Sequence, residues 1–175
     1  MDYQKYINES NPLVTMKIKG LGEIKLELFN DVAPNTVANF VTLIEKGYYN
    51  KLIFHRVIRN FMIQGGWGAD TECSIKGEFK SNGFNNELKH TRGVISMART
   101  MVKDSATGQF FIMHQNSHHL DGEYAGFGGM IEGFDVLDAI ASAQTDRSDQ
   151  PLNDIQIESV SVDLRGTKIQ EVQCV

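Results

Sequence analysis

The stretch FHRVIRNFMIQGG, residues 54–66, is mostly apolar but also carries a histidine, two arginines and a glutamine. Its two apolar halves and the polar pair between them predict a hairpin of two short strands joined by a tight turn. Alternation along the second strand places Met62 and Gln64 on one face of the hairpin, and Phe61 and Ile63 on the other. The polar residues of this hairpin therefore need an explanation.

Two interpretations explain why Arg56 stands among apolar neighbours. In the first, Arg56 and Gln64 line an apolar pocket as fixed polar groups, as in sites that bind small, partly apolar ligands. In the second, Arg56 lies on an ordinary sheet surface and extends its charged end into water. For an isolated arginine the second interpretation is the more common one, so the hairpin alone does not establish a binding site.

Alternation of apolar and polar residues predicts further strands on both sides of this hairpin. Before it, residues 13–29 form two alternating segments around Gly20-Leu21-Gly22, which is typical of a β-hairpin. The expected strands are the two within 13–29, then 52–58, 61–65, 94–98, 109–113, 125–131 and 155–164.

Two segments have the apolar spacing of a helix instead. One is expected over 34–46, with Pro34 in its first turn and Gly47 just after its end. Its apolar stripe consists of Val37, Phe40, Val41 and Ile44. The second helix is expected over 134–143, with Phe134, Leu137, Ile140 and Ala141 on one side.

Eight strands and two helices predict a mainly β fold. A closed eight-stranded antiparallel β-barrel leaves no free sheet edges, and the two helices would cap its open ends. A two-sheet sandwich with peripheral helices fits the same periodicity, and the pattern alone does not decide between them.

The composition excludes several classes of protein. A net charge of −5 over 175 residues gives no basic surface for nucleic acid, and no apolar run reaches the roughly 20 residues of a membrane span. Cys73 and Cys174 lie far apart in the sequence, so we expect reduced thiols rather than a disulfide. The polar first residues lack the apolar core of a signal peptide. A cytoplasmic protein is therefore expected.

Motifs for hydrolysis, dinucleotide binding and phosphate loops are absent from the sequence. The one cluster that suggests a metal comprises His114, His118, His119 and Asp121. Its spacing matches no strong metal motif, and a polar surface loop with histidines facing water is the simpler explanation. We expect no metal and no cofactor.

The hairpin resembles the sequence motif of the cyclophilin family of peptidyl-prolyl cis–trans isomerases. Further segments match that family in the same order along the chain. They are Gly77-Glu78-Phe79, Leu88-Lys89-His90-Thr91, 93–99, Gln109-Phe110-Phe111-Ile112 and His119-Leu120-Asp121-Gly122. The resemblance covers residues 13–165, which leaves 1–12 as a polar N-terminal extension and 166–175 as a C-terminal tail. It implies the capped barrel and an isomerase of X-Pro peptide bonds.

The resemblance also implies a role for individual residues. Arg56 matches the catalytic arginine, and Gln64 matches a polar group beside it. The expected pocket for the proline ring consists of Phe61, Met62, Phe111 and Leu120. The expected further contacts to substrate are His55, Ala98, Arg99, Thr100, Gln109, His119 and Tyr124, with the backbone of 98–100 pairing with the bound peptide.

Some positions depart from the family. Arg59-Asn60 replaces the Pro-Gly of many relatives, and the loop after Gly66 is short. His119 stands where cyclosporin-sensitive members carry tryptophan, so weak cyclosporin binding is expected. The expected partners are proline-containing peptides and unfolded or folding proteins, and the expected state is a monomer.

Two other classes of function fit parts of the sequence. A binding module would hold a proline-containing partner in the same groove without useful turnover, and an isomerase assay separates this from an enzyme. A carrier of small molecules would need a hollow barrel, whereas the sequence contains enough large apolar residues to fill one.

Overall fold

The computed structural model describes all 175 residues. Eight antiparallel strands form one sheet in the order β3-β4-β6-β5-β7-β2-β1-β8. The strands are β1 Leu13–Ile18, β2 Gly22–Leu28, β3 Arg56–Ile58, β4 Met62–Gly65, β5 Val94–Met97, β6 Phe110–Met113, β7 Gly126–Glu132 and β8 Ile157–Asp163. The helices are α1 Pro34–Glu45 and α2 Phe134–Ala141, with short 3-10 turns at Gln4–Tyr6, Lys80–Asn82 and His118–Leu120. The predicted number, order and type of the main elements are confirmed.

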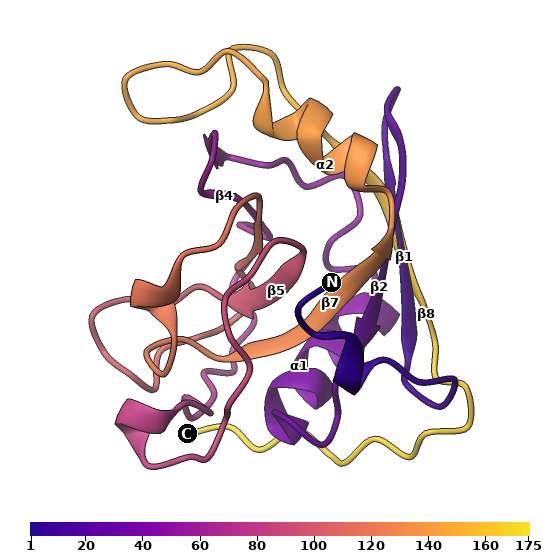
Figure 1. Cartoon of the computed structure of the whole chain (residues 1–175), viewed down its shortest axis with the longest axis vertical. Helices are drawn as coiled ribbons and strands as arrows, with labels where there is room; N and C mark the ends of the chain where they lie inside the picture. The colour runs from indigo at the N-terminus through magenta and orange to yellow at the C-terminus, as the bar shows by residue number, and fades with distance from the viewer.

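The sheet curls into a half-barrel, and the two helices lie at opposite ends of it (Figure 1). Its edge strands β3 and β8 form no continuous ladder with each other. They approach through one isolated bridge between Ile53 and Gln156, just before each strand begins. None of the helices combines the length and apolar character that a membrane crossing requires.

The inner face of the sheet carries the main hydrophobic core. The inward-facing side chains of all eight strands and both helices meet there, and aromatic rings fill the centre. Phe40 of α1 packs edge-on against Phe110 and Phe127, with ring centroids 5.8 and 5.1 Å apart. The interior is therefore occupied by the chain's own side chains, as the abundance of large apolar residues suggests.

Helix α1 begins at Pro34 as predicted, but its first turn is stabilised from a distance. The preceding Ala33 provides no side-chain cap. Instead, the buried carboxylate of Glu78 accepts hydrogen bonds from the backbone N–H groups of Asn35 and Thr36, and from the Thr36 hydroxyl. A carboxylate at this position satisfies free N–H groups and complements the helix dipole. These hydrogen bonds connect the loop that contains Glu78 to the first turn of α1.

The prediction of reduced cysteines is wrong, because Cys73 and Cys174 form a disulfide with their Cα atoms 5.3 Å apart. The C-terminal tail returns beside α1 (Figure 1), where the side chain of Asn35 bonds the backbone of Gln173 in both directions. The backbone N–H of Val175 then donates to Ser74. The prediction relied on the large separation of the two cysteines in the sequence. Residues far apart in the sequence can still lie close together in the fold, as these two do.

The outer face of β4, β6 and β5 carries a second, smaller hydrophobic cluster. Tyr3 from the N-terminal segment joins it, is 1% exposed and donates a hydrogen bond of 2.6 Å to the carbonyl oxygen of Met130. The cluster comprises Tyr3, Phe29, Met62, Leu88, Val94, Phe111, Met113 and Leu120. This outer cluster forms the base of the candidate site.

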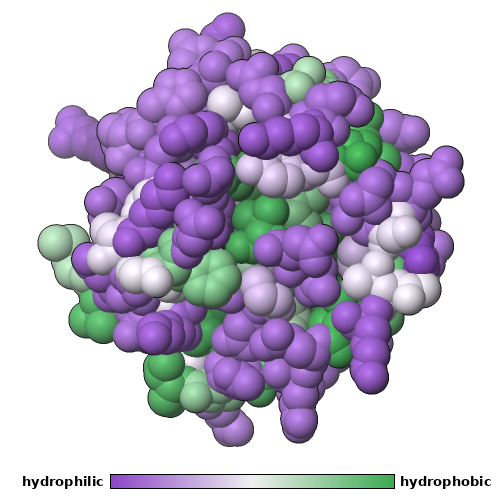
Figure 2. Space-filling model, turned by 60° about the horizontal axis from the view of Figure 1, so that its bottom comes forward, coloured by the Kyte–Doolittle hydropathy of each residue, from purple (hydrophilic) through white to green (hydrophobic).

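Most of the remaining surface is polar. The face in Figure 2 is largely hydrophilic, with one group of apolar side chains in a hollow near its centre and smaller ones toward its rim.

Candidate active site

The site is built on a row of residues that lie opposite one another across four strands. Arg56 on β3 pairs with Gln64 on β4, and Gln64 pairs in turn with Phe111 on β6. Phe111 then pairs with Ser96 on β5. Residues that are directly opposite share one face of a sheet. The pairing therefore places a guanidinium, an amide and an aromatic ring side by side on the outer face.

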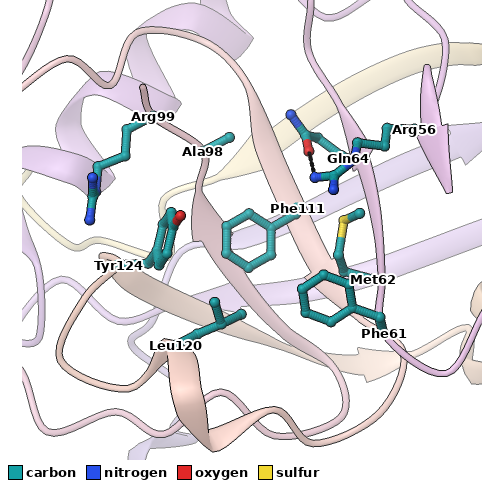
Figure 3. A pocket seen from close by; sticks show the side chains of 9 residues that line it. All are labelled: Arg56, Phe61, Met62, Gln64, Ala98, Arg99, Phe111, Leu120 and Tyr124. Atoms are coloured by element: carbon teal, nitrogen blue, oxygen red, sulfur yellow. Dashed lines mark hydrogen bonds between the residues drawn. The ribbon is translucent and has the colours of Figure 1, made fainter. Parts of the chain in front are cut away.

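An open pocket of about 140 Å³ lies over this row. This volume is well below the roughly 300–1,000 Å³ of pockets that bind drug-sized ligands, so a small ring suits it better. Phe111 lies in the centre of Figure 3, with the other side chains arranged around it. The lining residues are Arg56, Phe61, Met62, Gln64, Ala98, Arg99, Phe111, Leu120 and Tyr124.

Phe61 reaches this pocket in a way that strict strand alternation did not predict. Alternation placed it on the opposite face from Met62. In the structure β4 begins only at Met62, and Phe61 belongs to the turn before it. The turn is free of the alternation rule, so Phe61 and Met62 both line the pocket.

Polar side chains connect Arg56 to the rest of the site. Nη1 of Arg56 donates to Oε1 of Gln64 over 3.4 Å, drawn as a dashed line in Figure 3. Nε2 of Gln64 donates to Oε1 of Gln109 over 2.9 Å. Gln64 thus uses both ends of its amide within the protein, and its contact with the guanidinium at the pocket rim is the longer of the two.

His55 lies beside the pocket rather than in its lining. Its ring meets Trp67 edge-on, with centroids 5.3 Å apart. Burial lowers the pKa of His55, a hydrogen bond to Gln109 partly opposes this, and the charge of Arg56 lowers the pKa further. A neutral imidazole therefore borders the arginine at neutral pH.

A second pocket of about 140 Å³ adjoins the first and shares Gln64, Ala98 and Arg99 with it. Thr100 and Gln109, which the sequence also assigned to the site, lie here rather than in the first pocket. The other lining residues are Ser105 and Thr107. The two pockets together form a groove with an apolar half and a polar half.

The side chain of Arg99 forms part of the wall, which the sequence did not indicate. Its guanidinium stacks on Tyr124 at 4.6 Å and on Phe79 at 5.0 Å. Nε and Nη2 both donate to the carbonyl oxygen of Glu123. The backbone N–H and carbonyl of Arg99, in contrast, make no hydrogen bond within the protein.

A buried network supports Phe111 from below. The ring of His90 stacks on Phe111, its Nε2 lies 2.9 Å from Oγ of Ser96, and its Nδ1 lies 3.2 Å from Oδ1 of Asp121. These three side chains resemble a hydrolase triad, but Ser96 and His90 are both 0% exposed. Since no substrate reaches the hydroxyl, the network is a support and not a nucleophile. The sequence gave no role to it.

Burial decides the charge state of this network. Burial lowers the pKa of His90, and its hydrogen bond and attraction to Asp121 only partly oppose that effect. Burial alone would raise the pKa of Asp121, but hydrogen bonds from the His90 backbone, from His118 and from the His90 ring hold it below its ordinary value. At neutral pH the pair is a neutral imidazole beside an ionised carboxylate.

The histidines that suggested a metal do not converge in the structure. His118 bonds Asp121, His114 bonds Asp138, and the ring of His119 lies 5.8 Å from that of Phe61. The structure contains no group of three or more His, Cys, Asp or Glu side chains placed to hold a metal ion. His119 instead stands at the edge of the pocket.

Comparison with known proteins agrees with this geometry. Residues 13–162 match the family described as cyclophilin type peptidyl-prolyl cis-trans isomerase. A peptidyl-prolyl cis-trans isomerase of Acinetobacter baylyi is 45% identical over 143 residues, which cover 78% of this chain and 75% of that protein. Peptidyl-prolyl cis-trans isomerase B of Escherichia coli is 44% identical over 155 residues, covering 81% of this chain and 94% of the relative.

A solved structure leads to the same assignment. A cyclophilin type isomerase of Cryptosporidium parvum, crystallised in the presence of the dipeptide Ala-Pro, superposes with a TM-score of 0.78 at 32% identity. The match covers 86% of this chain and 98% of that one. With the curled eight-stranded sheet, two helices and matching sequence over residues 13–162, the chain belongs to the cyclophilin-type peptidyl-prolyl cis–trans isomerase family.

Proposed function

We propose that Arg56 accelerates rotation about X-Pro peptide bonds by stabilising the twisted amide, while the adjoining pocket holds the proline ring. The observation that carries this proposal is the direct pairing of Arg56 with Gln64 and of Gln64 with Phe111. It sets a permanent positive charge next to an apolar slot of small volume. The proposed proline pocket consists of Phe61, Met62, Phe111 and Leu120.

The required stabilisation is modest. The barrier to rotation is about 20 kcal/mol because the amide C–N bond has partial double-bond character. This gives a rate on the order of 10⁻² per second, and reaching about 10³ per second requires roughly 7 kcal/mol. No nucleophile and no cofactor are needed for a change that breaks no covalent bond.

An arginine suits this task for a specific chemical reason. When the amide twists, its nitrogen loses resonance, becomes pyramidal and exposes a lone pair. A guanidinium donor binds this nitrogen well only in the twisted state, which is selective binding of the transition state. Arginine stays protonated and has a rigid fork, and a site with little water strengthens its contact.

The proposed substrate lies along the 98–100 segment as an extended peptide. The backbone N–H and carbonyl of Arg99 are unpaired within the protein, so a peptide can pair with them as a strand does. The Cryptosporidium relative, crystallised in the presence of Ala-Pro, suggests an X-Pro ligand for this groove. The adjoining pocket at Thr100 and Gln109 would then receive a residue before the proline.

Peptide titration followed by NMR tests this placement. A short X-Pro peptide should shift the methyl signals of Met62 and Leu120 and the backbone amide of Arg99, whereas the same peptide with glycine in place of proline should not. Shifts confined to other parts of the surface would refute the proposed groove.

We further propose that the protein acts as a monomer on proline-containing segments of unfolded and folding proteins. Weak cyclosporin binding is proposed because His119 lacks the area and the N–H geometry of an indole. The net charge of −5 argues against nucleic acid as a partner.

We propose a cytoplasmic location, and the disulfide makes the redox state of Cys73 and Cys174 its test. Disulfides are rare in reducing compartments, and the argument from reduced thiols no longer applies. Alkylation of thiols in intact cells, followed by mass measurement of the isolated protein, decides the matter. Alkylated Cys73 and Cys174 would support a cytoplasmic location. A disulfide that leaves both residues unalkylated would argue for an oxidising compartment.

The proposed isomerase domain spans residues 13–165, with 1–12 and 166–175 as extensions that pack onto it. We infer that the sheet closes into a barrel through residues 51–54 against 155–157. Backbone hydrogen bonds from Lys51 to Ile157, from Phe54 to Ile155 and from Ile157 to Leu52 support this closure.

A further inference from the structure

The turn between β3 and β4 decides where Phe61 points. Asn60 in this turn has a φ of +64°, in the left-handed region that only a few residue types adopt readily. The backbone N–H of Phe61 donates to the carbonyl oxygen of Ile58 and closes the turn. Since Phe61 follows Asn60 directly, the conformation of the turn determines the position of one wall of the proposed proline pocket.

His114, directly after β6, holds this turn with both its side chain and its backbone. Nδ1 of His114 accepts a hydrogen bond of 2.9 Å from the backbone N–H of Asn60. The backbone N–H of His114 donates to the carbonyl oxygen of Phe61, also over 2.9 Å. His114 is 7% exposed, so water competes little for these contacts.

The far side of the ring is held from α2. Nε2 of His114 lies 3.0 Å from Oδ1 of Asp138, and Arg92 donates to both oxygens of the same carboxylate over 2.7 and 3.0 Å. Arg92 also donates to the carbonyl oxygen of His114. Because Nδ1 accepts from Asn60, Nε2 must carry the hydrogen that it donates to Asp138. The ring is thus fixed in one tautomer and one orientation.

We propose that His114 is a positioning residue for substrate binding, which acts by holding the Asn60 turn through Nδ1 so that Phe61 keeps its place in the pocket wall. This inference rests on the proposed role of Phe61 in binding the proline ring. His114 is not among the residues that line either of the two pockets. Its effect on catalysis is indirect and should appear in substrate binding rather than in the rotation step.

A purely structural role would use the other nitrogen. In that case the bond from Nε2 to Asp138 would join β6 to α2, and the contact with Asn60 would be incidental. The two roles therefore assign importance to different ring nitrogens, and amide side chains can separate them. Asparagine places its oxygen near the position of Nδ1, whereas glutamine reaches toward the position of Nε2.

The experiment compares His114→Asn with His114→Gln in the full chain, using KM and kcat for an X-Pro peptide. His114→Asn should keep the acceptor for Asn60 and leave KM within about twofold of wild type. His114→Gln should lose it and raise KM about 5–10-fold, with kcat within about twofold, which is the size of one buried hydrogen bond. Exchange of the Asn60 amide proton, followed by NMR, should be faster in His114→Gln only.

Phe61→Ala separates failure of this inference from failure of the proposed site. If Phe61→Ala leaves KM unchanged, the proposed pocket is wrong and the inference falls with it. If Phe61→Ala raises KM but the two His114 variants have the same KM, the pocket stands and the inference is overturned. The inference is also overturned if Asn60 exchanges faster in His114→Gln while its KM stays normal.

Discussion

The guanidinium of Arg56 lies 3.4 Å from Oε1 of Gln64, which is long for a hydrogen bond from a charged donor. The opposite end of Gln64 is held firmly, by a bond of 2.9 Å to Gln109. This weak contact orients the Arg56 side chain and leaves the other N–H groups of the guanidinium without a protein acceptor. In the proposed mechanism the guanidinium exchanges this contact for a stronger one to a twisted amide, as catalytic hydrogen bonds often tighten only in the transition state.

Removing the side chain of Gln64 should reduce turnover more than binding. In Gln64→Ala the guanidinium loses its orienting partner, so kcat should fall about 10-fold, the effect of one hydrogen bond to a charged group. A protease-coupled assay with an X-Pro peptide measures this. Gln109→Ala is the control, since it removes only the support of Gln64 and keeps both side chains of the contact between Arg56 and Gln64, and it should cost less. An equal or larger loss in Gln109→Ala would contradict the orienting role.

The disulfide should contribute strongly to stability. It closes a loop over a sequence separation of 101 residues, and such a link restricts the unfolded chain. Reduction, or Cys73→Ser, should lower the free energy of unfolding by roughly 2–4 kcal/mol. Denaturant unfolding with and without a reductant measures the difference.

The control for the disulfide is additivity. Cys174→Ser should match Cys73→Ser, and the double variant should add nothing further, because all three lack the same bond. Unfolding curves that do not respond to reductant would show that the bond contributes no stability in solution.

Stability should decrease on acidification below neutral pH. Burial lowers the pKa of His90, and that of His55 is lowered for the same main reason. The unfolded chain, whose histidines titrate near 6.5, therefore binds protons that the folded chain does not. The contribution is fully present above about pH 6.5 and is lost as pH falls toward the lowered values.

Thermal unfolding across pH 5–8, together with NMR titration of the His90 ring, measures this effect. His55→Gln removes the second contributor, so the remaining pH dependence belongs mainly to His90. A midpoint that stays constant or rises on acidification would refute the assignment of a neutral buried imidazole.

His119 should limit the affinity for cyclosporin. The centroid of its ring lies 5.8 Å from that of Phe61. An imidazole offers less apolar area than the indole of tryptophan, and its N–H lies at a different position. His119→Trp should therefore increase affinity by at least about 10-fold, measured by isothermal titration. Nanomolar binding by the unaltered protein would contradict this expectation.

Local patterns were sufficient for the strands and helices but not for contacts over long distances. The stripe of Val37 and Phe40 predicted α1, and both are buried. Tyr3 was not recognised as buried, because its partners on the outer face of the sheet are distant in sequence. The pairing of Cys73 with Cys174 depends on the path of the tail beside α1, which no local pattern encodes.

The sequence pattern alone left the role of the hairpin's polar residues open. The resemblance to the cyclophilin family assigned Arg56 and Gln64 to the site, and the register places them opposite each other. The hydrogen bonds of His90 to Asp121 and of His114 to Asn60 were not predicted, because each joins residues that are distant in the sequence. Alternation also failed at Phe61, since a turn residue does not follow the period of the strand that it precedes.

The most direct test of the central claim is the rate of X-Pro exchange, measured by NMR on a short peptide with wild type, Arg56→Lys and Arg56→Ala. Loss of the guanidinium in Arg56→Ala should slow exchange about 100–1,000-fold, while the fold and peptide binding persist. Arg56→Lys keeps the charge without the fork and should fall between the two. Near-normal exchange in Arg56→Ala would contradict stabilisation of the twisted amide by Arg56.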